Sequence, residues 1–414
     1  MGVVFSQQAG DELVANFGAG VDDEAYRELT TIRYSHPLVE DLNKLHPFSA
    51  EYRKLAMHVY NDLRGDVGRT YDPERDEASG IVADVADINT MASPWNFKNP
   101  NLISEFLHSW GQIFRHLDIK AGQSVLEYGT GSGQTLLMLA RAGIDCYGVD
   151  IDTSSLSILQ RQARDLGVKV STEQASFGEG FATHRFDRVL FFESFHHAFD
   201  FENLLLRLHD RILPGGKVVF CGEPVIQGVD SSIPYPWGPR LDALSVYCTR
   251  ARGWMELGFQ HDTFVDLLWR CGWKVSFHPF PTCGRAHVYV AEPAWSGVSM
   301  FEPVELGRHA GTWHPAENGH RWSKARSLLS LPVGVPGGLN VEVKLSNYLG
   351  SKKSVRLSSG TAMVEFTMAP GERDRVVAIH RCDGEELVIE CNTDSTPTDP
   401  RKLGVAVHHI SLSE

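Results

Sequence analysis

The sequence predicts an α/β protein: a doubly wound parallel sheet, preceded by a helical N-terminal segment and followed by an antiparallel β-sandwich. Three observations predict this order. The N-terminal part repeats apolar residues at three-to-four spacing, the middle alternates short apolar runs with amphipathic segments, and the last part holds only short, often alternating apolar runs. A chain of 414 residues is long enough for two or three such domains.

The change of pattern places the boundaries. We expect the helical segment at residues 1–95, the parallel-sheet domain at 96–292 and the sandwich at 293–414. Residues 231–259 interrupt the sheet pattern and are rich in Pro, Trp, Tyr and Arg. Because long insertions at strand carboxyl ends commonly cover substrates, we interpret 231–259 as a substrate lid.

Composition excludes several classes of function. A net charge of −13 argues against nucleic acid as the main partner, which calls for clustered Lys and Arg. No apolar run is long enough to span a membrane, and no signal peptide is recognisable. Seven cysteines without a C-x-x-C pair indicate neither a disulfide framework nor a zinc ribbon, so we expect a cytoplasmic protein. A small-molecule or saccharide substrate fits this acidic composition, and a homo-oligomer is compatible with it.

The stretch "VLEYGTGSGQT" predicts a nucleoside-binding loop. A buried strand runs into Gly129, Gly131 and Gly133, and a helix follows at once. The next strand ends at Asp150, where an acid is well placed to hold ribose hydroxyls. A dinucleotide fingerprint would need glycine at position 134, which is occupied by Gln134. Glu127, which precedes the loop, can instead pair with the positively charged amino-acid portion of a ligand.

With these residues the chain resembles the class I S-adenosylmethionine-dependent methyltransferases, which have a Rossmann-like sheet. The matching stretches, in the order of the family, are "VLEYGTGSGQ", "GVDID", "FDRVLFFESFHH" and "ILPGGKVVFCGEP". The resemblance implies S-adenosyl-L-methionine as cofactor, with the three glycines around its methionine part, Glu127 near its amino group and Asp150 on its ribose. The family's usual acid near adenine is not evident; Glu173, Gln174 and Ser176 are alternatives.

Four polar residues follow the fourth and fifth strands, where methyl transfer would take place. Glu193, His196, His197 and Glu223 should converge on the crevice, because the carboxyl ends of neighbouring parallel strands share one edge. An alcohol acceptor benefits from a base, and we favour His197, with His196 second, because similar family members carry histidine there. Structural roles are the alternative for each residue. Glu193, Glu223 and a histidine could instead bind a metal, but no compact metal spacing supports this, so we predict none.

The insertion and the last domain suggest the acceptor. Trp237 and Trp254 could stack on it, and Arg240 could pair with a phosphate or carboxylate; packing in a subdomain is the alternative. The ending "DPRKLGVAVHHISL" resembles accessory β-domains of bacterial polysaccharide-modifying enzymes. We therefore expect O-methylation of a sugar in a cell-surface polysaccharide or glycolipid. A small natural product or an amine as acceptor, and a non-catalytic glycan-binding or scaffold protein, are the alternatives.

Overall fold

A computed structural model describes residues 3–17, 28–66, 68, 70–78, 94–228, 230–294, 309, 311–332 and 339–413. The chain divides into two compact units. The first contains Met1–His261 and Phe277–Val290, and the second contains Asp262–Ser276 and Ala291–Glu414.

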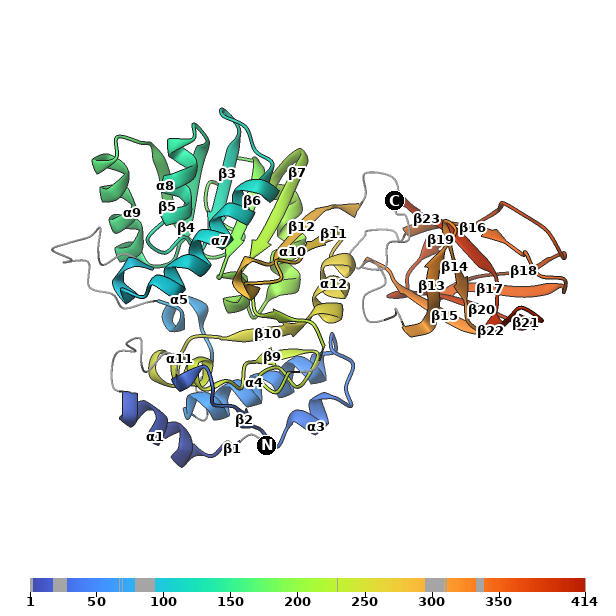
Figure 1. Cartoon of the computed structure of the whole chain (residues 1–414), viewed down its shortest axis with the longest axis horizontal. Helices are drawn as coiled ribbons and strands as arrows, with labels where there is room; N and C mark the ends of the chain where they lie inside the picture. Colours follow the sequence, from blue (N-terminus) through green and yellow to red (C-terminus); the bar gives the residue numbers. More distant parts are fainter. Residues whose placement is uncertain are drawn as a thin grey trace. The chain divides into compact units, whose positions relative to one another are not determined.

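The first unit holds most of a doubly wound sheet, as predicted (Figure 1). Its strand order is β11-β12-β7-β6-β3-β4-β5. The strands β7, β6, β3, β4 and β5 pair in parallel, and the order reverses between β3 and β6. Such a reversal opens a crevice at the carboxyl ends of the two strands. The strand bounds are β3 (Ser124–Tyr128), β4 (Asp145–Asp150), β5 (Val170–Gln174), β6 (Phe186–Phe192), β7 (Ile212–Cys221), β11 (Trp273–His278) and β12 (Val288–Pro293).

Helices connect the strands as the amphipathic segments predict. Leu136 of α8 and Leu159 of α9 pack against strand residues such as Val125 in one core cluster. On the other face, Phe201 of α10 joins a stack of aromatic rings that includes Phe191 of β6. The helices are α7 (Pro100–Leu117), α8 (Gln134–Arg141), α9 (Thr153–Asp165), α10 (Phe201–Leu208) and α12 (His261–Arg270), with 3₁₀ turns η1 (Trp95–Phe97), η2 (Phe195–His197), η3 (His209–Arg211) and η4 (Gly284–Ala286).

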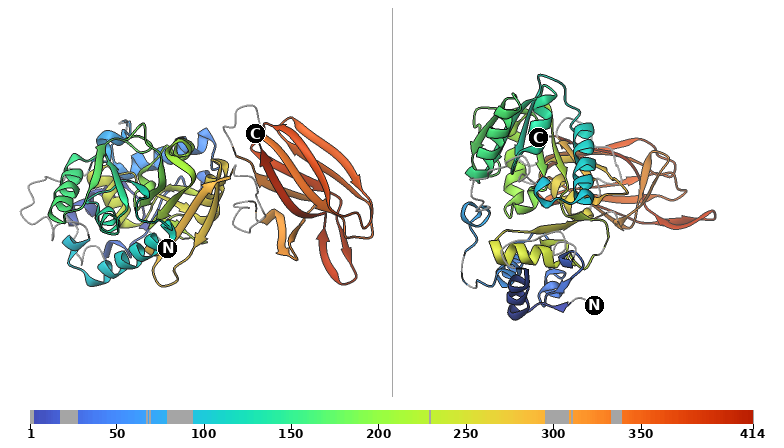
Figure 2. Two further views of the ribbon diagram at one scale, coloured as in Figure 1. Left: turned by 90° about the horizontal axis from the view of Figure 1, so that it is seen from above. Right: turned by 60° about the vertical axis from the view of Figure 1, so that its left-hand side comes forward.

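The N-terminal helices pack against the insertion between β7 and α12, and the two lie side by side in Figures 1 and 2 (blue and yellow). The hydroxyl of Tyr60 donates to the carbonyl of Gly253 over 2.5 Å, and Arg250 forms an ion pair with Asp11 at 2.7 Å. The elements are β1 (Val3–Val4), α1 (Gln7–Phe17), β2 (Tyr34–Ser35), α3 (Val39–Leu42), α4 (Ala50–Arg64) and α5 (Pro73–Asp76), and in the insertion β8 (Val225–Ile226), β9 (Trp237–Pro239), α11 (Ala243–Arg252) and β10 (Leu257–Gln260).

The C-terminal strands form the predicted antiparallel sandwich (orange to red in Figure 2). One sheet has the order β13-β14-β23-β16-β19 and the other β15-β20-β17-β18. Its core includes Trp313, and Trp322 is also buried, so neither ring offers a flat face to a sugar. The strands are β13 (Trp313–Glu317), β14 (His320–Ser323), β15 (Arg326–Ser330), β16 (Leu339–Ser346), β17 (Lys353–Ser359), β18 (Ala362–Met368), β19 (Arg375–Cys382), β20 (Glu386–Cys391), β21 (Asp394–Thr396), β22 (Asp399–Leu403) and β23 (Ala406–Ser413).

Two further predictions concern membrane-spanning segments and disulfide bonds. Among the residues described, no helix is long and apolar enough to cross a membrane. All seven cysteines are free thiols.

Candidate active site

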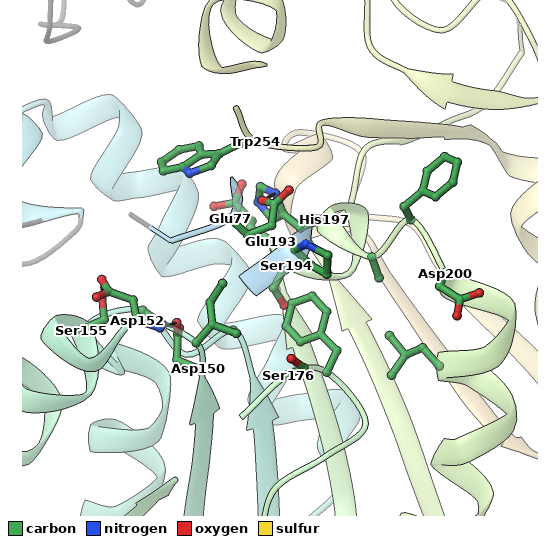
Figure 3. A pocket seen from close by; sticks show the side chains of 18 of the residues that line it. Glu77, Asp150, Asp152, Ser155, Ser176, Glu193, Ser194, His197, Asp200 and Trp254 are labelled. Atoms are coloured by element: carbon green, nitrogen blue, oxygen red, sulfur yellow. Dashed lines mark hydrogen bonds and ion pairs between the residues drawn. The ribbon is translucent and has the colours of Figure 1, made fainter. Parts of the chain in front are cut away.

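A cavity of about 700 Å³ opens at the carboxyl ends of β3, β4 and β6. Figure 3 shows Asp150, Asp152 and Ser155 at one side of it, and Glu77, Glu193 and His197 gathered near its centre below Trp254. Its wall thus combines the strand ends with residues of the N-terminal segment and of the insertion. This is the crevice at which a doubly wound sheet binds its ligand.

The loop after β3 needs its three glycines for two different reasons. Gly129, Gly131 and Gly133 have φ angles of 69°, 49° and 69°, a left-handed backbone that disfavours other residues. A Cβ on Gly133 would lie 2.3 Å from Leu159 Cδ1, whereas a Cβ on Gly131 would meet nothing within 4 Å. Gly133 permits close helix packing, and Gly131 leaves bare backbone at the wall of the cavity.

Two acids flank this loop. The carboxylate of Asp150 accepts the backbone N–H groups of Gly131 and Asp152, each over 2.9 Å, and it lines the cavity. Burial raises the pKa of Asp150, and these two hydrogen bonds oppose that rise. A carboxylate offers about four acceptor sites, so Asp150 retains acceptors for a ligand's hydroxyls.

Glu127 lies deeper, at the end of β3, and it is not among the residues that line the cavity. Its Oε2 is buried and has no hydrogen-bond partner in the described part of the chain. Burial raises the pKa of Glu127 to about 8, a hydrogen bond from Thr135 opposes the rise, and Asp150 adds to it. An acid in this state gains most from a cation placed beside it.

The three alternatives at the end of β5 differ in the structure. Ser176 lines the cavity together with Phe177. The carboxylate of Glu173 accepts the N–H of Phe181 over 2.7 Å, and the amide of Gln174 donates to the carbonyl of Ile151 over 3.0 Å. Ser176 is therefore the polar side chain of the three that reaches the ligand space.

Glu223 organises the loop after β6. Its carboxylate accepts the N–H groups of Ser194, Phe195 and His196 over 3.0 to 3.1 Å, and its Oε2 lies 2.8 Å from His196 Nδ1. Glu223 and His196 are buried and do not line the cavity. The structure thus places them behind the loop, where they hold its shape.

Glu193 and His197, in contrast, face the cavity. Glu193 has a φ of 51°, an uncommon backbone for this residue type, and its carboxylate pairs with the guanidinium of Arg285. His197 Nδ1 lies 3.0 Å from Glu77 Oε2. Burial alone would lower the pKa of His197, but Glu77, Glu256 and Glu223 outweigh it and raise the pKa to about 9.

The strands that build this site match a known family. Residues 126–220, which include the glycine loop, Asp150 and the loop after β6, match the family described as "Methyltransferase domain". The chain carries a class I methyltransferase domain. S-adenosylmethionine is the cofactor that this family implies, and the open Gly131 backbone, Asp150 and the unpartnered Glu127 oxygen fit its amino-acid and ribose groups.

Individual relatives match parts of the chain. Methyltransferase GfsG of Streptomyces halstedii is 27% identical over 124 residues, which cover 28% of this chain and 43% of that protein. A ubiquinone biosynthesis O-methyltransferase of Citrobacter koseri is 26% identical over 149 residues, which cover 33% of this chain and 59% of that protein. The chain therefore spans less than two thirds of the length of either relative.

A solved structure is similar to part of the chain. It is an S-adenosylmethionine-dependent methyltransferase from Mesorhizobium loti, 17% identical, with a TM-score of 0.36. The match covers 44% of this chain and 96% of that one.

The insertion beside the methyltransferase domain contributes one of the three substrate residues predicted in it. Trp254 lines the cavity and lies edge-on to His197, with ring centroids 6.1 Å apart. Trp237 is only 1% exposed, packs on Tyr52 and donates its ring N–H to Pro47, so its surface is not available for stacking on an acceptor. Arg240 forms an ion pair with Asp242 at 2.9 Å and does not line the cavity.

Among the residues that the structure describes, one group of side chains near the cavity has the composition and spacing to hold a metal ion. Ligand atoms of His196, His197 and Glu256 all lie within 4.8 Å of one another. The set that the sequence suggested is different, because Glu193 pairs with Arg285 and Glu223 binds the backbone of the loop.

Three residues at this site, Tyr71, Glu77 and Glu256, were not identified from the sequence. Glu77 ends the short helix α5, whose start carries a recognisable signal: Asp72 caps it and Pro73 occupies its first turn. That signal predicts a helix at this point, but it does not show that the helix faces β6.

Proposed function

We propose that the chain is an S-adenosylmethionine-dependent methyltransferase that methylates a hydroxyl oxygen of a saccharide in a cell-surface polysaccharide or glycolipid. The observation that most directly supports this proposal is that Asp150, Gly131 and His197 line one cavity. Cofactor residues and a proton acceptor thereby share a single space. Its free thiols suit the reducing cytoplasm, where we expect it to act.

The cofactor residues have separate tasks. Glu127 would bind the amino group of S-adenosylmethionine, Asp150 its ribose, and the open backbone at Gly131 would let the ligand approach closely. When bound, the cofactor supplies a methyl group already activated on a sulfonium. The protein's main task is then to align the acceptor oxygen with that carbon.

His197 is the residue that we propose as the base. It would act in its neutral form, the minor form below its pKa of about 9. In that form its free nitrogen would accept the hydroxyl proton as the oxygen–carbon bond forms and the carbon–sulfur bond breaks, with the electron pair remaining on sulfur. Glu77 at Nδ1 orients the ring so that the other nitrogen is the one left for the acceptor. His196 is less suited to this role because it is buried against Glu223.

The lining of the cavity bears on the acceptor. Its carboxylates outnumber its cations, Arg207 and His197, and they belong to Glu77, Asp150, Asp152, Glu193 and Asp200. An acidic wall disfavours phosphate or carboxylate acceptors and suits a neutral, hydroxyl-rich one. Trp254 adds a ring whose N–H has no hydrogen-bond partner in the described residues, a combination that suits the apolar face and the hydroxyls of a sugar.

The same carboxylates favour a second candidate, an amine-bearing small natural product, because they attract a cation. Incubation of the purified chain with methyl-labelled S-adenosylmethionine and either glycan fractions or small phenols and amines separates the two. Label recovered as an O-methyl sugar after hydrolysis supports the proposal. Label on an amine or phenol supports the second candidate. Binding of glycan without methyl transfer to any acceptor would support the alternative of a non-catalytic glycan-binding or scaffold protein.

A further inference from the structure

Two imidazoles and a carboxylate converge beside the cavity, and each has a partner that fixes its orientation. His196 Nδ1 lies 2.8 Å from Glu223, and its Nε2 lies 3.7 Å from Glu256 Oε2. His197 Nδ1 lies 3.0 Å from Glu77. Protein metal sites commonly show this arrangement, in which a histidine ligand donates its second nitrogen to a carboxylate.

The distances are close to those of a bound ion. Atoms that sit about 2.1 Å from one metal are roughly 3.0 to 3.5 Å apart in octahedral or tetrahedral geometry. The three candidate ligand atoms lie within 4.8 Å of one another, and one pair is already at 3.7 Å. Binding would therefore shorten the separations between ligand atoms by up to roughly 1.8 Å, which side-chain rotation can supply.

The charge of this cluster also favours a cation. Glu77, Glu223 and Glu256 contact the two imidazoles, and the guanidinium of Arg240 lies 4.0 Å from Glu256. Even when His197 is counted as a second cation, three carboxylates and one guanidinium leave negative charge in excess in a largely buried place. Buried charge of this kind must be compensated.

We propose that His196, His197 and Glu256 bind a divalent transition-metal ion. Two nitrogen ligands and one oxygen suit Mn²⁺, Fe²⁺ or Zn²⁺ better than Mg²⁺ or Ca²⁺, which prefer oxygen. Glu223 and Glu77 act as orienting partners of the two histidines. His197 lines the cavity, so the ion would sit in its wall.

The use of the ion rests on the proposed function, although its binding does not. Three protein ligands leave coordination positions open, and a hydroxyl of the acceptor can take one of them. The ion lowers the pKa of that hydroxyl, whose proton passes to water. The oxygen lone pair then forms the bond to the methyl carbon, and the carbon–sulfur electron pair stays on sulfur. In the ion-loaded enzyme His197 is thus a ligand, and it is a base only when the ion is absent.

The test uses the full chain after removal of metal with a chelator. Mn²⁺ and Zn²⁺ are titrated by calorimetry, and pulsed electron spin resonance of bound Mn²⁺ detects coordinated histidine nitrogen. We expect one ion per chain, nitrogen coupling from two imidazoles, and at least ~100-fold weaker binding in Glu256→Gln and His196→Gln. The control is Glu179→Gln, since Glu179 is half exposed and pairs with Arg207 outside the cluster.

The outcomes separate the two proposals. Absence of nitrogen coupling in the wild-type protein, or equal ion affinity in wild type, His196→Gln and the control, would overturn the metal site; the first readout does not depend on whether a variant folds. If the ion binds as expected but no acceptor is methylated, the metal site stands and the proposed function fails. If methyl transfer is unchanged by chelator and no ion binds, the proposed function stands with His197 as base.

Discussion

The carboxylate of Glu77 lies 3.0 Å from Nδ1 of His197, which joins the N-terminal segment to the loop after β6. The other oxygen of Glu77 accepts the hydroxyl of Tyr71 over 2.8 Å and the N–H of Met255 over 2.6 Å. Glu77 therefore connects three separate parts of the chain at the cavity. Its position is fixed by groups other than His197, so it can orient the imidazole.

The first prediction concerns this pair. Glu77→Gln should lower kcat by about 10- to 100-fold, because an amide no longer holds the imidazole by an ion pair. The dissociation constant of S-adenosylmethionine should change little, since the contacts of Glu77 in the described part of the chain are with His197, Tyr71 and Met255. Steady-state kinetics and calorimetry measure the two quantities.

A matched control lies on the same helix. Glu74 is exposed, and Glu74→Gln should leave kcat unchanged. If Glu77→Gln retains the wild-type kcat, Glu77 does not orient the reacting group.

The cofactor half of the site could be predicted because its signals are local. The strand to Tyr128, the glycines and the helix from Gln134 are consecutive, and each glycine reports a left-handed backbone. Asp150 followed because parallel strands end at one edge of the sheet. The doubly wound parallel sheet likewise follows from the alternation of strands and helices.

The second prediction tests Asp150. Asp150→Ala should weaken S-adenosylmethionine binding at least about tenfold, or 1.4 kcal/mol, because a ribose acceptor is lost and the Gly131 N–H loses its partner. Asp145→Asn is the control, since Asp145 is exposed at the opposite end of the same strand. Equal cofactor affinity in wild type and a folded Asp150→Ala variant would argue against a ribose role.

The third prediction follows from the raised pKa of Glu127, about 8 in the cofactor-free protein. At pH 7 this acid is mostly protonated, and a cationic amino group beside it favours the ionised form. Binding of S-adenosylmethionine at pH 7 should therefore release about 0.9 proton, and affinity should rise as pH increases from 6 towards 8.

Calorimetry in two buffers with different ionisation enthalpies counts this proton. Glu127→Gln cannot release one, and its affinity should be flat over the same pH range. Proton release that is identical in the variant would assign the effect to another group.

The acceptor side was harder to predict, because its contacts join distant parts of the chain. Glu77 and Glu256 reach His196 and His197 through the packing of the N-terminal helices on the insertion, and no spacing in the sequence records that packing. Trp237 and Trp254 look alike in the sequence, since both are tryptophans in one aromatic-rich insertion. Only burial distinguishes them: the ring of Trp237 fills the core beside Tyr52, and Trp254 lines the cavity.

The fourth prediction contrasts these two tryptophans. Trp237→Ala should destabilise the protein by about 3–5 kcal/mol, because it empties a fully buried site and leaves the carbonyl of Pro47 without its donor. Trp254→Ala should unfold near the wild-type temperature but raise the KM for the acceptor about tenfold, because Trp254 lines the cavity. Trp254→Phe keeps a ring without the N–H, and its KM for the acceptor should lie between those of the wild type and Trp254→Ala. Thermal unfolding and acceptor kinetics make the comparison, and a wild-type acceptor KM in Trp254→Ala would remove this residue from the acceptor site.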